Sequence, residues 1–230
     1  DNYSMDEENT QKYIQDVLDI KEKYQDQIQI FLGIEEDILG KPFLKHQPYD
    51  YIIGSVHFVK AGEQYLAVDE SYVTTQKIVQ YYGDFLNYAK SYYQEAKKIA
   101  YRDEVDIVGH IDLLTKFNEN EDFISFHSEQ YLQMAYECID LLIEKKKIFE
   151  VNTGAIARGL RKTPYPHKIL LKYIHDHGGK ICLNSDCHQK EMLDCYYDEA
   201  LQLIQECGFT SMMLLTENGF VEKDIQEFIK

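Results

Sequence analysis

The sequence predicts an α/β domain with a barrel-like parallel sheet, and three observations support this. Short apolar segments rich in Ile, Val and aromatic residues alternate with longer helical segments, a pattern typical of a parallel sheet covered on both faces. Polar residues that could bind a metal follow many of these segments, as in a barrel. In a doubly wound sheet such residues gather instead at the one point where the strand order reverses. No linker rich in Pro, Gly or Ser interrupts the chain, so we expect a single domain over residues 1–230.

The first expected element is a helix over residues 5–25. Ser4 and Glu7 have the spacing of a capping box, and Tyr13 and Val17 begin a run of apolar residues at helical intervals. Six strands are expected in the apolar segments 28–35, 51–57, 105–110, 148–152, 180–185 and 211–216. Helices are expected over residues 74–101, 123–144, 167–177 and 191–207, with a last helix after the final strand.

Five of the predicted strands end in residues that can bind a metal. The segments are Gly33-Ile34-Glu35, Gly54-Ser55-Val56-His57, Gly109-His110-Ile111-Asp112, Glu150-Val151-Asn152 and Ser185-Asp186-Cys187-His188. In a barrel such ends converge on one mouth. Carboxylate and imidazole together suit zinc, iron or manganese, whereas calcium and magnesium prefer oxygen ligands. Any one of these residues could instead cap a helix or form a hydrogen bond to a loop. Five strands that all end in potential ligands nevertheless predict a transition-metal site.

A basic loop follows the strand at 148–152. Arg158 and Arg161 lie in it, and a guanidinium group can bind two oxygens of a phosphate at once. The alternative is a solvated loop before a charged helix start. Both interpretations remain open for the two arginines.

The composition disfavours several classes of function. A net charge of −16 repels a nucleic-acid backbone, and no basic stripe with interleaved aromatic residues offsets it. No apolar run approaches the roughly 20 residues that span a bilayer, and no signal peptide is recognisable. We therefore expect a cytoplasmic protein that binds neither nucleic acid nor membrane; the oligomeric state is not predicted.

The order of five motifs resembles the polymerase-and-histidinol-phosphatase (PHP) superfamily. They read GIE, GSVHF, GHID, EVNTGAIARGLRKTPYP and SDCH, and the resemblance covers essentially the whole chain from Glu35 to the expected terminal helix. Within the superfamily the sequence is most similar to histidinol-phosphate phosphatases. The resemblance implies a distorted (β/α)7 barrel, similar to a TIM barrel, that holds up to three divalent transition-metal ions (Zn, Fe or Mn).

The resemblance also implies roles for individual residues. Glu35 would bridge two metals, and His57 and His110 would complete one of those sites. Asp186 would bind another metal and His188 the third. The expected reaction is hydrolysis of a small phosphorylated substrate, L-histidinol phosphate, by a metal-bound hydroxide held through Asp186 and His188. Arg158 and Arg161 would bind the phosphate.

One departure from the family pattern concerns the start of the barrel. The family begins with a strand that ends in a His-x-His pair, followed by a further histidine, and no histidine precedes Glu35 here. We expect the first strand to be missing from this chain, which makes the domain N-terminally incomplete. The alternatives are a non-catalytic PHP-like domain that lacks a complete cluster, or another PHP phosphoesterase or nuclease.

Overall fold

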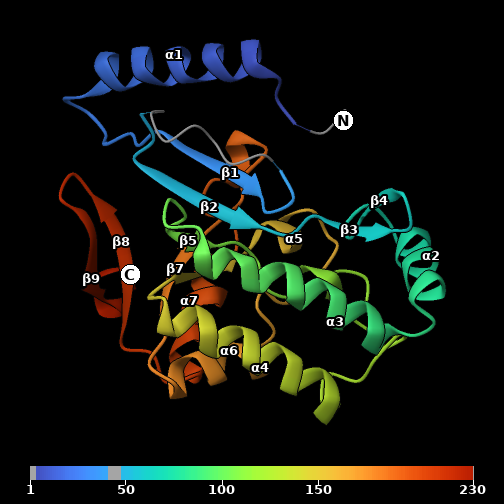
Figure 1. Ribbon diagram of the computed structural model, residues 1–230. Helices are drawn as coiled ribbons and strands as arrows, with labels where there is room; N and C mark the ends of the chain where they lie inside the picture. The colour runs from blue at the N-terminus through green and yellow to red at the C-terminus, as the bar shows by residue number, and fades with distance from the viewer. Residues whose placement is uncertain (1–3, 41–47, 230) are drawn as a thin grey trace.

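The computed structural model describes residues 4–40 and 48–229, in which a parallel sheet forms the centre (Figure 1). The sheet has five strands in the order β1-β2-β5-β6-β7, and all neighbouring pairs are parallel. Their bounds are β1 Gly33–Asp37, β2 Tyr51–Ser55, β5 Ile107–Val108, β6 Ile148–Asn152 and β7 Lys180–Asn184. The predicted α/β class with a parallel sheet is therefore confirmed. The strand order follows the chain without the reversal that defines a doubly wound sheet.

Helices cover the sheet and connect its strands (Figure 1). The α-helices are α1 Glu7–Tyr24, α2 Tyr72–Tyr82, α3 Phe85–Ala96, α4 Glu129–Glu144, α5 Gly154–Ala157, α6 Lys168–Asp176 and α7 Tyr197–Glu206. Short 3-10 helices are η1 Lys97–Tyr101, η2 Leu113–Thr115, η3 Lys190–Met192 and η4 Ile225–Glu227. Helix α1 lies beside β1, where the Tyr13 hydroxyl donates to the carbonyl oxygen of Gly33 at 2.6 Å. None of the helices in the described part of the chain has the length and apolar character needed to cross a membrane.

The sheet has a packed core on each face. On β6, Phe149 faces the larger core between the sheet and the helices. Its neighbour Ile148 faces a smaller core with Ile107 and Cys182, against which Phe220 also packs. Side chains alternate between the two faces of a strand, and every residue of β6 is buried. Burial on both faces explains why the strand begins with two consecutive apolar residues, Ile148 and Phe149.

The predicted helix over residues 74–101 is wrong as a single element. It is divided into α2, α3 and η1, and the first break lies at Gly83, whose φ is +89°. Glycine adopts such a backbone readily, whereas most other residues do not. Asp84 then caps α3, because its side chain accepts a hydrogen bond from the Asn87 amide at 2.7 Å.

The predicted terminal helix is also wrong, because β8 Ser211–Thr216 turns back into an antiparallel strand, β9 Gly219–Asp224. The two-residue turn is Glu217-Asn218, and Gly219, whose φ is +86°, begins β9 directly after it. A second hairpin, β3 Phe58–Ala61 and β4 Gln64–Ala67, was not predicted either. At the N-terminus, α1 is capped by Asp6 and not by Ser4.

Candidate metal centre

Glu35, in β1, meets His57 and His110, which lie two residues beyond the carboxyl ends of β2 and β5. Oε1 of Glu35 lies 3.3 Å from Nε2 of His57 and 3.2 Å from Nε2 of His110. One ligand atom from each residue lies within 4.8 Å of the others. The two imidazole rings stand edge to face, with centroids 5.1 Å apart. The structure thus brings together three of the five predicted metal ligands.

Two further side chains orient this group. The Ser55 hydroxyl donates to Oε1 of Glu35 at 2.6 Å. The carboxylate of Asp37 accepts a hydrogen bond from the backbone amide of His57 at 2.6 Å and lies 3.6 Å from its Nδ1. Sequence reasoning missed Asp37, although it stands two residues after Glu35 and the alternation of a strand places both on one face.

The charges in this group are strongly coupled. Partial burial alone would raise the pKa of Glu35, but hydrogen bonds from His110 and His57 outweigh it and hold that pKa well below its usual value. Burial alone would lower the pKa of His57, but its bonds to Asp37 and Glu35 raise the pKa to about 10. Positive charge on the neighbouring imidazoles favours the anionic form of this carboxylate, and a divalent cation would favour it in the same way.

The donor set fits a divalent metal ion. It consists of one carboxylate and two imidazoles, the mixture that zinc and similar transition metals favour. Asp37 supports His57 from behind, as carboxylates commonly support metal-binding histidines. The described residues therefore contain a candidate divalent-metal site.

Asp186 and His188 form a second group at the end of β7. Nε2 of His188 lies 3.2 Å from Oδ1 of Asp186, and Nη2 of Arg158 donates to Oδ2 of Asp186 at 2.8 Å. A Cβ atom on Gly154 would lie only 2.6 Å from that Oδ2, so glycine leaves room for the carboxylate. The metal-ligand role of the pair stays a prediction, because these two residues do not join the three-residue group.

The two arginines of the basic loop have different surroundings. Arg158 is partly exposed beside Asp186. Arg161 buries its guanidinium, which donates to the Thr115 hydroxyl at 3.0 Å, lies 3.4 Å from a Glu119 carboxylate oxygen and stacks on the Tyr165 ring at 4.2 Å. Arg161 could contact a phosphate directly only if its contacts with Thr115, Glu119 and Tyr165 were broken. Arg158 is partly exposed, so it needs no such change.

Gly109 gives a test of the packing around Glu35. A Cβ atom there would lie 2.1 Å from the Ser55 hydroxyl, so Gly109→Ala is expected to lower the free energy of unfolding by about 1–3 kcal/mol through overpacking. The penalty should shrink in a Ser55→Ala background, where that hydroxyl is absent. Urea unfolding in chelator measures both, and an equal penalty in the two backgrounds would contradict this account.

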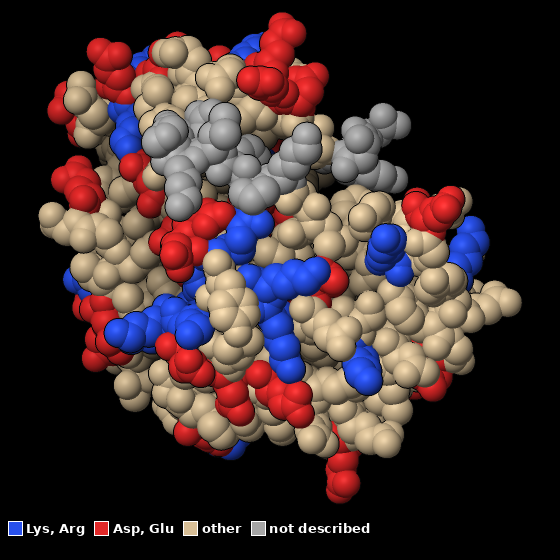
Figure 2. All heavy atoms as spheres, viewed as in Figure 1, with Lys and Arg blue, Asp and Glu red and all other residues tan. Residues whose placement is uncertain are grey.

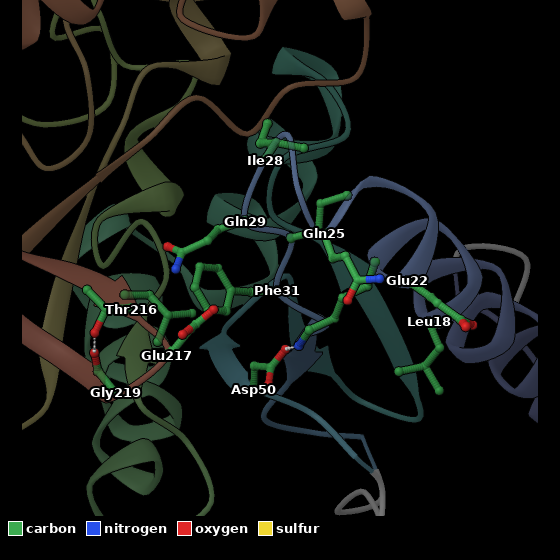
Figure 3. A pocket seen from close by; sticks show the side chains of 13 residues that line it. Leu18, Glu22, Gln25, Ile28, Gln29, Phe31, Asp50, Thr216, Glu217 and Gly219 are labelled. Atoms are coloured by element: carbon green, nitrogen blue, oxygen red, sulfur yellow. Dashed lines mark hydrogen bonds and ion pairs between the residues drawn. The ribbon is translucent and has the colours of Figure 1, made fainter.

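The surface carries charge of both signs. On the face in Figure 2, lysine and arginine side chains gather near the centre with acidic side chains beside them. A separate pocket of about 560 Å³ lies between α1, the segment before β1 and the β8–β9 turn (Figure 3). Asp50 lines it and forms an ion pair with Lys21 at 2.7 Å. No predicted site residue lines this pocket.

Comparisons with known proteins place the chain in a family. The family model of the PHP domain matches residues 1–154. A Schizosaccharomyces pombe protein named "Probable histidinol-phosphatase" is 26% identical, over 93% of this chain and 72% of that protein. The Bacillus subtilis histidinol-phosphatase is also 26% identical, over 86% of this chain and 78% of that protein.

Two solved structures share the fold. The HisK protein of Listeria monocytogenes aligns with a TM-score of 0.73 at 22% identity, over 85% of this chain and 77% of that one. Histidinol phosphate phosphatase of Lactococcus lactis, solved with zinc, L-histidinol and phosphate, aligns with a TM-score of 0.64 at 19% identity, over 95% of this chain and 80% of that one. The family predicted from the five motifs is confirmed, because the family model covers more than half of the sequence. The chain belongs to the PHP domain family.

Proposed function

We propose that this protein is a metal-dependent phosphate monoester hydrolase whose substrate is L-histidinol phosphate. The observation that carries the proposal is the convergence of Glu35, His57 and His110 at the strand ends. The names of the relatives, and the zinc, L-histidinol and phosphate bound in the Lactococcus lactis protein, support the substrate. In the reaction, water adds across the P–O bond and releases inorganic phosphate and L-histidinol.

The metals are proposed to be up to three divalent ions of Zn, Fe or Mn. Glu35, His57 and His110 would hold one part of the cluster, and Asp186 and His188 the other. Such ions lower the pKa of water and offset charge on phosphoryl oxygens. Arg158 and Arg161 are the proposed phosphate-binding residues, and Arg158 is the more accessible of the two.

The domain is proposed to be a distorted (β/α)7 barrel over residues 1–230 whose first strand lies outside this chain. In the described residues, β2 is the only strand paired with β1, and Tyr13 of α1 donates a hydrogen bond to the Gly33 carbonyl of β1. The five parallel strands follow the order of the chain, as the strands of a barrel do, which supports the proposal.

The test is removal and return of metal. Dialysis against a chelator should abolish phosphate release from L-histidinol phosphate, and Zn²⁺ or Mn²⁺ should restore it. p-Nitrophenyl phosphate and single-stranded DNA serve as comparison substrates, because a nuclease would prefer the diester. Unchanged turnover in chelator, with no metal in the protein by elemental analysis, would overturn the proposal.

A further inference from the structure

Glu150 is a buried carboxylate below the metal centre. It lies in β6, between the strand that leads to His110 and the strand that leads to Asp186, and is 4% exposed. The side chain is not part of the three-residue ligand group. The proposed function gives it no role, although its segment is one of the five polar strand ends in the sequence.

The two oxygens of Glu150 accept three hydrogen bonds from amide groups. Oε2 accepts from the backbone N–H of His110 at 3.0 Å and from the side-chain amide of Asn152 at 3.1 Å. Oε1 accepts from the side-chain amide of Asn184 at 2.9 Å. These bonds connect β6 with both neighbouring strands. In a buried setting, leaving any of the three donors unpaired costs more than the bond itself contributes.

The three hydrogen bonds of Glu150 connect to both halves of the proposed cluster. The His110 half consists of Glu35, His57 and His110, and the Asp186 half consists of Asp186 and His188. His110 belongs to the group with Glu35. Asn184 ends β7, two residues before Asp186. Asn152 also leads to Asp186, because its Oδ1 accepts from the Gly154 amide at 2.9 Å. Gly154 in turn packs against the Asp186 carboxylate.

We propose that Glu150 is a positioning residue that sets the spacing between the His110 half and the Asp186 half of the metal cluster. This rests on the proposed function, because it requires that both halves bind metal. Ligands must be held within about 0.5 Å of their working geometry for a site to bind well. A single carboxylate that fixes the backbone of one half and the strand end of the other can provide this.

The test compares Glu150→Leu with Glu150→Gln. Leucine has a similar volume but leaves all three donors unpaired, and metal affinity should fall by about 10–100-fold. Glutamine keeps an oxygen for His110 and Asn152, and the Asn184 amide can rotate to accept from the new amide. Glu150→Gln should therefore recover most of the affinity. Co²⁺ titration followed by absorption, with Zn²⁺ competition, measures binding without relying on turnover.

A second variant and a matched control separate positioning from general stability. Asn184→Ala removes only the connection to β7, so it should weaken ions held by Asp186 and spare those held with Glu35. Glu36→Gln alters a carboxylate that is equally buried but is paired with Arg102. It should lower the melting temperature and leave Co²⁺ affinity unchanged.

The outcomes distinguish the two proposals. Metal binding by the unaltered protein, with unchanged affinity in folded Glu150→Leu, would overturn the role of Glu150 alone. If Glu150→Leu does not fold, unchanged affinity at both halves in Asn184→Ala would overturn it. A failure of the unaltered protein to bind metal would overturn the proposed function, and the positioning role with it.

Discussion

Glu35→Gln is expected to lower phosphate release by more than about 100-fold, because loss of a metal ligand should exceed the 10–100-fold effect of changing an outer partner. Oε1 of Glu35 is the point on which Ser55, His57 and His110 converge. A neutral amide removes the negative charge that balances the cation and places an N–H group beside other donors. Activity against L-histidinol phosphate, together with metal content, measures the effect.

The adjacent residue provides the control. Glu36 lies on the other face of β1 and forms a buried ion pair with Arg102. Burial raises the pKa of Glu36, and the charge on Arg102 counteracts this. Glu36→Gln should reduce the free energy of unfolding by about 1–3 kcal/mol, because Arg102 loses one of its two carboxylate partners and keeps Glu104 at 2.6 Å. It should keep metal binding. Equal loss of metal in both variants would mean that Glu35 acts through stability and not as a ligand.

The strands of the central sheet could be predicted from sequence because burial on both faces leaves a local signal. Val108 and Phe149, like their neighbours Ile107 and Ile148, are apolar on either face. The helix break at Gly83 and the final hairpin were missed although local signals existed. Gly83 and Gly219 have φ values of +89° and +86°, and the backbone geometry at these glycines decided the outcome.

The candidate ligands were predictable for a different reason. Parallel strands bring their carboxyl ends to one edge, so Glu35, His57 and His110 could be expected to meet without knowledge of any loop. The burial of Arg161 could not be foreseen, because its partners Thr115 and Glu119 come from a distant part of the chain. Contacts between distant residues leave no local pattern.

Phe149→Ala is expected to have the largest effect on stability. The Phe149 ring is fully buried on β6, a strand with neighbours on both sides, and its removal should cost about 3–5 kcal/mol through lost burial and the cavity left behind. Tyr101→Ala is the control, since that ring is 68% exposed and such a change should stay within about 0.5 kcal/mol. Urea unfolding in chelator measures both values.

Addition of metal is expected to distinguish substitutions on the two faces of β6. Phe149 faces the helices, whereas its neighbour Glu150 bonds toward the metal centre. A metal that binds only the folded state stabilises it by RT ln(1 + [L]/Kd). Phe149→Ala should therefore gain the same increment from metal as the unaltered protein, whereas Glu150→Leu should gain less. A reduced increment in Phe149→Ala would show that the two faces of the strand are coupled and that metal binding depends on the whole core.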